Sequence, residues 1–159
     1  MTKSSLIVLT SIVAIAALTA AGCVNSAAPS PSPSPAPSGA PVLLEGTMWT
    51  LTSFVTEGGT TNVLPNTTIT ITFNGGNATG SAGCNRYFAH YELSGHNITI
   101  TSLGSTLMYC GNPGVMIQET TYEQLLQSTA AYAISGDTLS LINGAGQDQL
   151  VFRAVNATA

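Results

Sequence analysis

The sequence predicts an α+β fold: a small antiparallel β-sheet or partly closed barrel of seven or eight strands, packed with one α-helix. Three observations lead to this prediction. Apolar and polar residues alternate in several short segments, as they do in half-buried strands. Clusters of glycine and asparagine separate these segments at turn spacing. One stretch alone has helical periodicity, and many short strands with a single helix are typical of an antiparallel α+β domain.

The first strands are predicted at residues 49–55 and 68–73. In the second of these, three large apolar residues occupy one face and threonines occupy the other. The sequence Asn-Gly-Gly-Asn at 74–77 is a strong turn signal, because Asn and Gly adopt positive φ at little cost. A short strand of small residues over 79–82 should follow this turn.

A hairpin is predicted from residues 87–93 and 96–101, with a turn at Ser94-Gly95. In this register Leu93 lies opposite His96. The alternation then places His96 on the apolar face of the hairpin.

One helix is predicted after Asn112, which would be its N-cap, with Pro113 at the first helical position. Its inward stripe would comprise Val115, Glu119, Tyr122, Leu126 and Thr129. Three more strands should follow it, at 131–135, 138–142 and 149–155. Their turns are again rich in glycine and asparagine.

The N-terminus has the pattern of an export signal, which we assign to residues 1–22. Lys3 precedes an apolar run, and small residues follow that run directly before Cys23. A Cys at this point resembles a lipobox, although Ala20 stands where the usual pattern has Leu. We therefore expect lipidation of Cys23. Ordinary cleavage after an Ala, or an uncleaved anchor, is the alternative.

Residues 23–41 would form a tether after this cysteine, since Pro and Ser alternate there and favour an extended spacer. The folded domain is expected at 42–155, with a short tail at 156–159. Without the signal, the chain has two basic and seven acidic residues, which gives a net charge of −5. Such a chain should not bind nucleic acid, because binding depends on neutralising phosphates with Lys and Arg.

If Cys23 is lipidated, Cys84 and Cys110 remain as an even pair. Cysteines of an exported chain are expected to oxidise, so these two should form a disulfide. A redox or metal pair is the alternative. The chain has no CxxC spacing, and only Arg86 lies near either residue to lower a thiol pKa.

The segment from Gly80 to Tyr87 reads GSAGCNRY and resembles the GxxGCNxxxGxY signature of the META domain family, whose members include HslJ-like heat-shock lipoproteins. Residues 49–51, 105–110, 116–119 and 139–141 are similar to further family features in the same order. Ala89 departs from the pattern, which commonly has Gly there. The resemblance covers 44–153 and implies a small antiparallel β-structure with one helix and a paired set of cysteines. It implies no settled biochemical activity.

Asn85, Arg86 and Tyr87 of this motif are candidate binding residues. An Asn directly after a bridged cysteine is also a common turn former, whose amide bonds the loop backbone. Arg86 could contact an anion or a partner, being one of two basic residues outside the signal.

Four sequons at Asn66, Asn77, Asn97 and Asn156 are candidate N-glycosylation sites. They fall at predicted turns, at the tail or on a polar face. Such positions suit a chain exposed outside the cell.

Two groups of residues resemble functional sites by type, but their predicted positions exclude this. His90, Glu92 and His96 cannot converge on a metal in the predicted register, because His96 faces the other way. Glu119 and Glu123 lie one helical turn apart, but Glu119 should cap the helix or face the sheet and Glu123 should face solvent. No motif of nucleophile and base occurs, so we expect no catalytic site, metal or cofactor.

These features predict a membrane-anchored, extracytoplasmic lipoprotein of the cell surface whose domain is a non-catalytic binding or envelope-stress module. Its partners would be the membrane, through the N-terminal lipid, and an envelope protein, a lipid or a glycan. A secreted protease-inhibitor-like module is the alternative. Such an inhibitor would present a rigid exposed loop, for which 74–77 and 111–114 are candidates.

Overall fold

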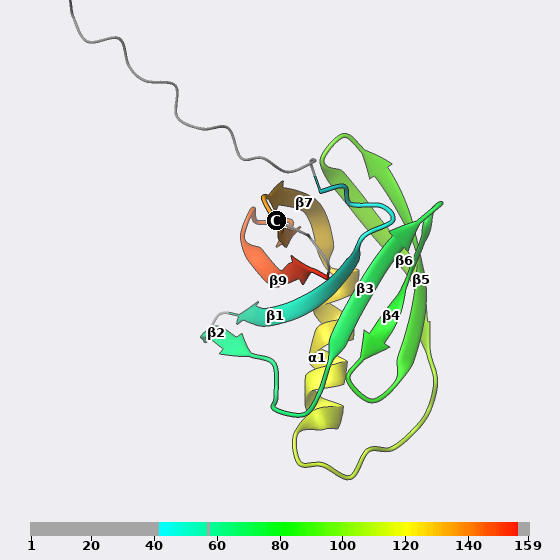
Figure 1. Cartoon of the computed structure of the whole chain (residues 1–159), viewed down its shortest axis with the longest axis vertical. Coiled ribbons are helices and arrows are strands. Elements are labelled where there is room, and N and C mark those ends of the chain that lie inside the picture. Colours follow the sequence, from blue (N-terminus) through cyan, green and yellow to red (C-terminus); the bar gives the residue numbers. More distant parts are fainter. Residues whose placement is uncertain (1–41, 57, 156–159) are drawn as a thin grey trace, which may run out of the picture. The chain divides into compact units, whose positions relative to one another are not determined.

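The computed structural model describes residues 42–56 and 58–155. These residues form nine strands and one helix (Figure 1). The elements in chain order are β1 (Met48–Thr56), β2 (Gly59–Asn62), β3 (Ile69–Asn74), β4 (Asn77–Ala82), β5 (Arg86–Ser94), β6 (Asn97–Ser105), α1 (Val115–Gln127), β7 (Thr129–Ser135), β8 (Thr138–Asn143) and β9 (Asp148–Ala154).

The strands form one antiparallel sheet that closes on itself through β1. Consecutive strands pair from β3 to β9, and β1 pairs with β3 on one edge and β9 on the other. The predicted α+β class and the partly closed barrel are therefore confirmed. Closure leaves few open edges, which are the costly feature of small sheets.

The ninth strand, β2, was not expected from the sequence. It pairs with the second half of β1, where Phe54 lies opposite Thr61. All four residues of β2 are exposed. The segment therefore lacks the apolar alternation by which the other strands are recognised.

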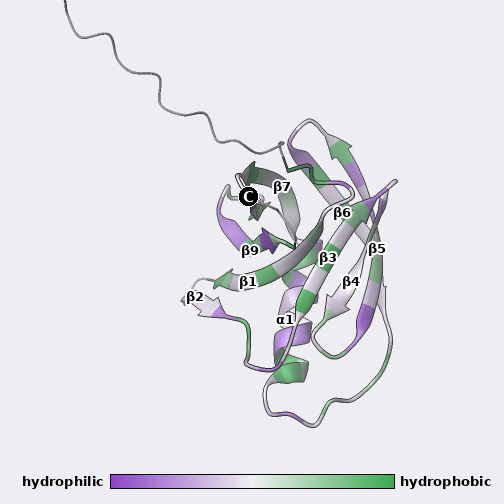
Figure 2. Cartoon of the chain, in the orientation of Figure 1, coloured by the Kyte–Doolittle hydropathy of each residue, from purple (hydrophilic) through white to green (hydrophobic). Residues whose placement is uncertain are grey.

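The core fills the inside of the ring and lies under α1. Figure 2 shows apolar and polar residues alternating along the strands, as the period of two requires. Trp49 is completely buried, and its indole N–H donates to the Leu44 carbonyl at 3.2 Å. The other large side chains with almost no exposure are Tyr122, Phe73, Phe152, Ile69, Ile71, Ile98, Leu126, Leu139, Leu141 and Leu150.

Helix α1 begins two residues later than predicted. Its N-cap is Gly114, in the left-handed region at φ 85°, and no side chain caps the first turn. Asn112 instead accepts a turn bond from the Val115 amide through its carbonyl, at 3.3 Å. The expected stripe is buried, because α1 packs on β4, β6 and β9. Thr129 is buried too, but it belongs to β7.

The register predicted for the β5–β6 hairpin was wrong by one residue on each strand. Ser94 pairs with Asn97 and Leu93 with Ile98, so the turn is Gly95-His96. Gly95 has φ 63°, which suits a tight two-residue turn. His96 therefore lies in the turn rather than on the apolar face, with its ring 5.8 Å from that of Tyr132. Leu93, which was predicted on the apolar face, is 41% exposed and is not part of the core.

Candidate functional site

The most distinctive local structure surrounds the cysteine pair. Cys84 and Cys110 form a disulfide with their Cα atoms 6.0 Å apart, as the sequence predicted. The bond ties the short bend between β4 and β5 to the loop that joins β6 to α1. We call this loop, residues 106–114, the stapled loop.

Asn85 attaches the stapled loop a second time. It is only 2% exposed. Its Oδ1 accepts hydrogen bonds from the Met108 amide and the Thr106 hydroxyl, both at 2.7 Å. Its Nδ2 donates to the Met108 carbonyl at 3.0 Å and to Glu119 at 2.6 Å. The amide therefore bonds loop backbone, which was the structural alternative raised for this residue.

Glu119 reaches the same bend from α1. Its Oε2 accepts from the backbone amides of Asn85 at 2.7 Å and Cys84 at 3.2 Å. The side chain is only 5% exposed, so these charge-assisted bonds replace the water that a buried carboxylate loses. Bend, helix and stapled loop are thus held as one unit.

Three large apolar side chains project from this fixed loop. Leu107 is 98% exposed, Tyr109 84% and Met108 61%. In Figure 1 the loop lies at the end of the domain opposite to the first described residues. Side chains of this kind usually lie inside a protein, so their exposure on a restrained backbone needs a functional explanation.

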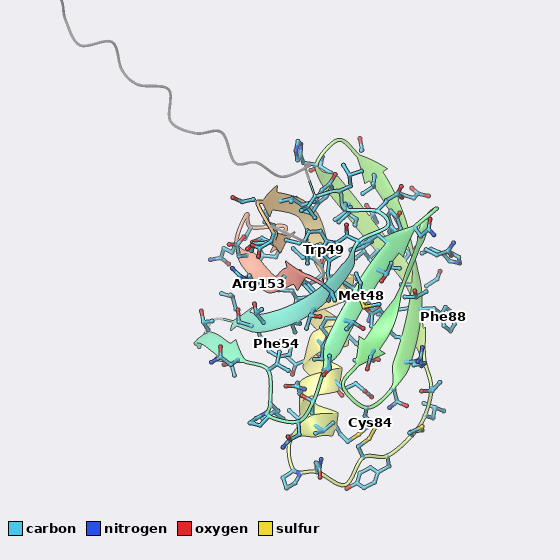
Figure 3. The ribbon with its side chains drawn as sticks, in the orientation of Figure 1. Met48, Trp49, Phe54, Cys84, Phe88 and Arg153 are labelled. Carbon is cyan, nitrogen blue, oxygen red and sulfur yellow. A yellow bond between two sulfur atoms is a disulfide. The ribbon has the colours of Figure 1, made fainter. Side chains whose placement is uncertain are left out.

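An apolar groove of about 300 Å³ opens at the start of α1, between this helix and β2. Phe54, Leu64 and Ile117 line it, and Ile117 is 74% exposed. The first turn of α1 is correspondingly apolar in Figure 2, and Figure 3 labels Phe54 on β1. Gln118 holds the adjoining segment, accepting from the Leu64 amide at 2.7 Å. We call the stapled loop and this groove the apolar end.

Arg86 and Tyr87 occupy different environments. Arg86 is exposed on β5, whereas Tyr87 is 3% exposed. The Tyr87 hydroxyl donates to the Thr70 carbonyl at 2.9 Å and lies 2.6 Å from the Tyr122 hydroxyl. Burial, with the neighbouring Tyr122, raises the pKa of Tyr87 well above its usual value. Of the three candidate binding residues, only Arg86 thus has an exposed side chain.

Gly80, at the start of the motif, makes this tyrosine bond possible. A Cβ at Gly80 would lie 1.9 Å from the Thr70 carbonyl oxygen. That oxygen is the acceptor of the Tyr87 hydroxyl, so a larger residue would displace both. The spacing of the motif therefore reflects backbone packing behind the disulfide.

Glu123 differs from its predicted position. It is half-buried, and its Oε1 is buried without a hydrogen-bond partner. Burial raises the pKa of this carboxyl, a hydrogen bond from Ser105 opposes the shift, and the charge of Glu119 adds to it. Glu119 and Glu123 therefore do not act as a pair of carboxylates. Glu119 binds the bend at Cys84 and Asn85, whereas Glu123 has a buried oxygen without a partner.

The remaining candidate residues lie apart from the apolar end. Asn66 is exposed in a turn at φ 63°, and Asn77 and Asn97 are exposed at the starts of β4 and β6. Cys23 and Asn156 lie outside the described residues. Over residues 42–56 and 58–155, no group of three potential metal ligands converges. The single helix of that part of the chain is too short and polar to cross a membrane.

Sequence reasoning missed the apolar part of this site. Residues 107–109, Leu-Met-Tyr, are three consecutive apolar residues with no polar alternation, directly before Cys110. A surface strand or helix would bury only some of these side chains. The uninterrupted apolar run was therefore the sequence feature that could have indicated an exposed apolar surface here. The sequence predicted that Glu119 caps the helix or faces the sheet. It did not predict that Glu119 binds the bend at Cys84 and Asn85, because these residues are distant in the chain.

The fold and the motif define a class of protein. The family model of the META domain matches residues 42–156. The chain therefore belongs to the META domain family.

Two solved structures have a similar fold. An NMR structure of a protein from Burkholderia xenovorans has 28% sequence identity and a TM-score of 0.61, covering 71% of this chain and 84% of the other. A second NMR structure, of a protein with 23% identity, has a TM-score of 0.56 and covers 73% and 95%, which shows the fold alone. No curated protein matches the sequence.

Proposed function

We propose that this META-domain protein is a non-catalytic binding module, anchored outside the cell through Cys23, whose apolar end takes an apolar partner. One observation carries the proposal. Leu107, Met108 and Tyr109 are exposed on a loop that a disulfide and the buried Asn85 hold in place.

The energetics support a binding role for this loop. Burying one such side chain stabilises by about 1.5–3 kcal/mol, so three left in water represent a substantial unused contribution. A flexible loop could fold them inward, but the bonds to Met108 and Cys110 prevent this here. A restrained apolar surface loses little conformational entropy on binding, which favours affinity.

The export pattern supports the location. The apolar run before Cys23 and the Pro/Ser tether suit a lipoprotein. Mass spectrometry of the N-terminal peptide should find a diacylglycerol thioether on Cys23, and Cys23→Ser should release the protein from the membrane fraction. An unmodified or absent Cys23 in the mature chain, with the protein still membrane-bound, would contradict the anchor.

The binding role can be tested by photo-crosslinking. A benzophenone amino acid would replace Tyr109 in the full chain in its native membranes, with Glu92 on β5 as the matched exposed control. We expect a discrete crosslinked product, a lipid or one protein, at position 109 only. Adding Leu107→Ser and Ile117→Ser should remove it. Products that are equal at both positions, or none at 109, would overturn the proposal.

A further inference from the structure

A second surface lies on the outer face of four neighbouring strands, β1, β3, β4 and β5. We propose that this surface binds an acidic glycan, an oligosaccharide that carries uronic acid carboxylates. We call it the hydroxyl face. A cleft of about 450 Å³ in it shares no lining residue with the groove of the apolar end, and is lined by Met48, Thr70, Thr72, Thr79, Gly80, Ser81, Cys84, Arg86 and Tyr87.

Strand register aligns the face into two rows. The first row runs across β1, β3, β4 and β5 through Thr50, Thr70, Ser81 and Arg86. The second row runs across the same strands through Met48, Thr72, Thr79 and Phe88. Side chains directly opposite on neighbouring strands lie about 5 Å apart. The first row therefore has three hydroxyls between Arg86 and Arg153, which lies opposite Thr50, and the second has two hydroxyls between Met48 and Phe88.

Arg86 supplies the positive charge. It is exposed and makes no ion pair within the described residues, whereas Arg153 lies 3.4 Å from Asp137. These two are the only basic residues beyond Lys3 in a chain of net negative charge. A guanidinium binds a carboxylate through two parallel hydrogen bonds, so an unpaired one beside a cleft is an anion-binding group.

The hydroxyls are available to a ligand. Thr70 accepts from the Ser81 amide at 3.2 Å and Ser81 from the Gly83 amide at 3.3 Å, which leaves both O–H groups free to donate. Within the part of the chain that the structure describes, the Thr72 and Thr79 hydroxyls have no hydrogen-bond partner. Rows of hydroxyls match the alternating donors and acceptors of a sugar chain.

Exposed apolar side chains flank the hydroxyls. Phe88 is 59% exposed and Met48 50%. The Phe88 ring lies against Gly104, where an added Cβ would come within 2.7 Å of Cζ. Figure 3 shows Phe88 projecting from β5 away from the domain, so its outer side can pack on the apolar face of a sugar ring.

A peptide fits this face less well than a glycan. An extended peptide usually binds by adding a strand to an open sheet edge. Here β3, β4 and β5 each pair on both sides, and the first half of β1 pairs with both β3 and β9. These parts of the strands therefore have no open edge, and they offer a ligand only side chains and their hydroxyls.

The test uses the full chain in detergent micelles and a fluorescein-labelled trigalacturonate, with binding followed by fluorescence anisotropy. Arg86→Gln should weaken binding about tenfold, as expected for loss of a charge-assisted pair. Arg153→Gln is the comparison variant, because Arg153 lies at the other end of the first row, opposite Thr50, and already pairs with Asp137 (Figure 3). It should change affinity by less than about twofold. Thr72→Val and Thr79→Val should each cost about threefold, and Thr99→Val on β6 nothing.

Four outcomes would overturn the proposal, three of which concern specificity. These three are an equal effect of the two arginine variants, equal binding of the methyl-esterified trigalacturonate, and equal competition by a hexaglutamate peptide. Absence of binding at millimolar ligand would also do so. Near-ultraviolet circular dichroism of each variant would show that the fold is retained. Failure here leaves the crosslinking result at Tyr109 unaffected, because the two surfaces have different linings.

Discussion

At the scale of single residues, two glutamates on one helix show how surroundings assign roles. The Glu119 carboxylate accepts three hydrogen bonds from the bend at Cys84 and Asn85. Glu123, one turn later, has a buried oxygen with no partner. Glu119 therefore organises the site, whereas Glu123 is expected to weaken the fold when it is charged.

Glu123→Gln should stabilise the protein at neutral pH and have little effect in acid. Burial raises the folded-state pKa of this carboxyl above 4.5, so folding favours its protonated form. The protonated carboxyl therefore contributes stability that is complete below the unfolded-state pKa. This contribution is lost as pH rises through the folded-state pKa. Urea unfolding at pH 7 and near pH 4 would measure the difference.

Glu92→Gln on the outer face of β5 is the control, because it removes the same charge from an exposed position. It should change the free energy of unfolding at pH 7 by less than Glu123→Gln does. A Glu123→Gln variant that is no more stable than this control at pH 7 would show that the buried oxygen has little effect.

At the scale of elements, the start of α1 is set by backbone conformation rather than by a capping side chain. Asn112 and Pro113 have the residue types of a helix start, yet the helix begins after Gly114. The chain must turn there at φ 85°, close to Leu64, which only glycine allows without strain. Gly114 also ends the stapled loop and lines the groove.

Gly114→Ala should destabilise the domain by about 1–2 kcal/mol, because a Cβ at positive φ is strained and would meet Leu64 Cδ1 at 3.2 Å. Gly111→Ala in the same loop is the control. A Cβ there meets nothing within 4 Å, and its φ is not positive. Chemical denaturation of both variants would test this, and equal stabilities would argue against strain at the helix start.

At the scale of the whole molecule, a closed ring of short strands holds both candidate surfaces. Strand β1 pairs with β2, β3 and β9, so it joins the two ends of the sheet. A domain of this size buries only part of its surface, which makes one covalent bond a large share of its stability. The Cys84–Cys110 disulfide joins the sheet to the loop before α1.

Replacing both cysteines by serine should lower the free energy of unfolding by about 3.5 kcal/mol, from the loop-closure entropy of a 26-residue separation. Thermal unfolding of the full chain with and without the bond would measure the loss. Because Asn85 still bonds Met108, we expect the stapled loop to keep its place in the folded state. A loss below about 1 kcal/mol would contradict this expectation and would indicate residual structure in the unfolded chain.

Much of the fold could be predicted because its signals are local. Alternation located eight of the nine strands, and β2 escaped because all its residues are exposed. The hairpin register was wrong because Ser94-Gly95 and Gly95-His96 are both plausible two-residue turns. Only the pairing of Ser94 with Asn97 decides between them.

The sequence by itself determined the strand pattern, the single helix, the cysteine pair and the META family motif, because each depends on residues close in the chain or on a count. Tertiary structure decided what those residues do. Glu119 meets Asn85 across 34 positions, and Arg86 joins a row of hydroxyls that begins on β1. Exposure of Leu107 and Tyr109 likewise depends on how the ring closes and where the disulfide holds the loop. Such contacts arise only when distant strands pair, and local periodicity carries no information about them.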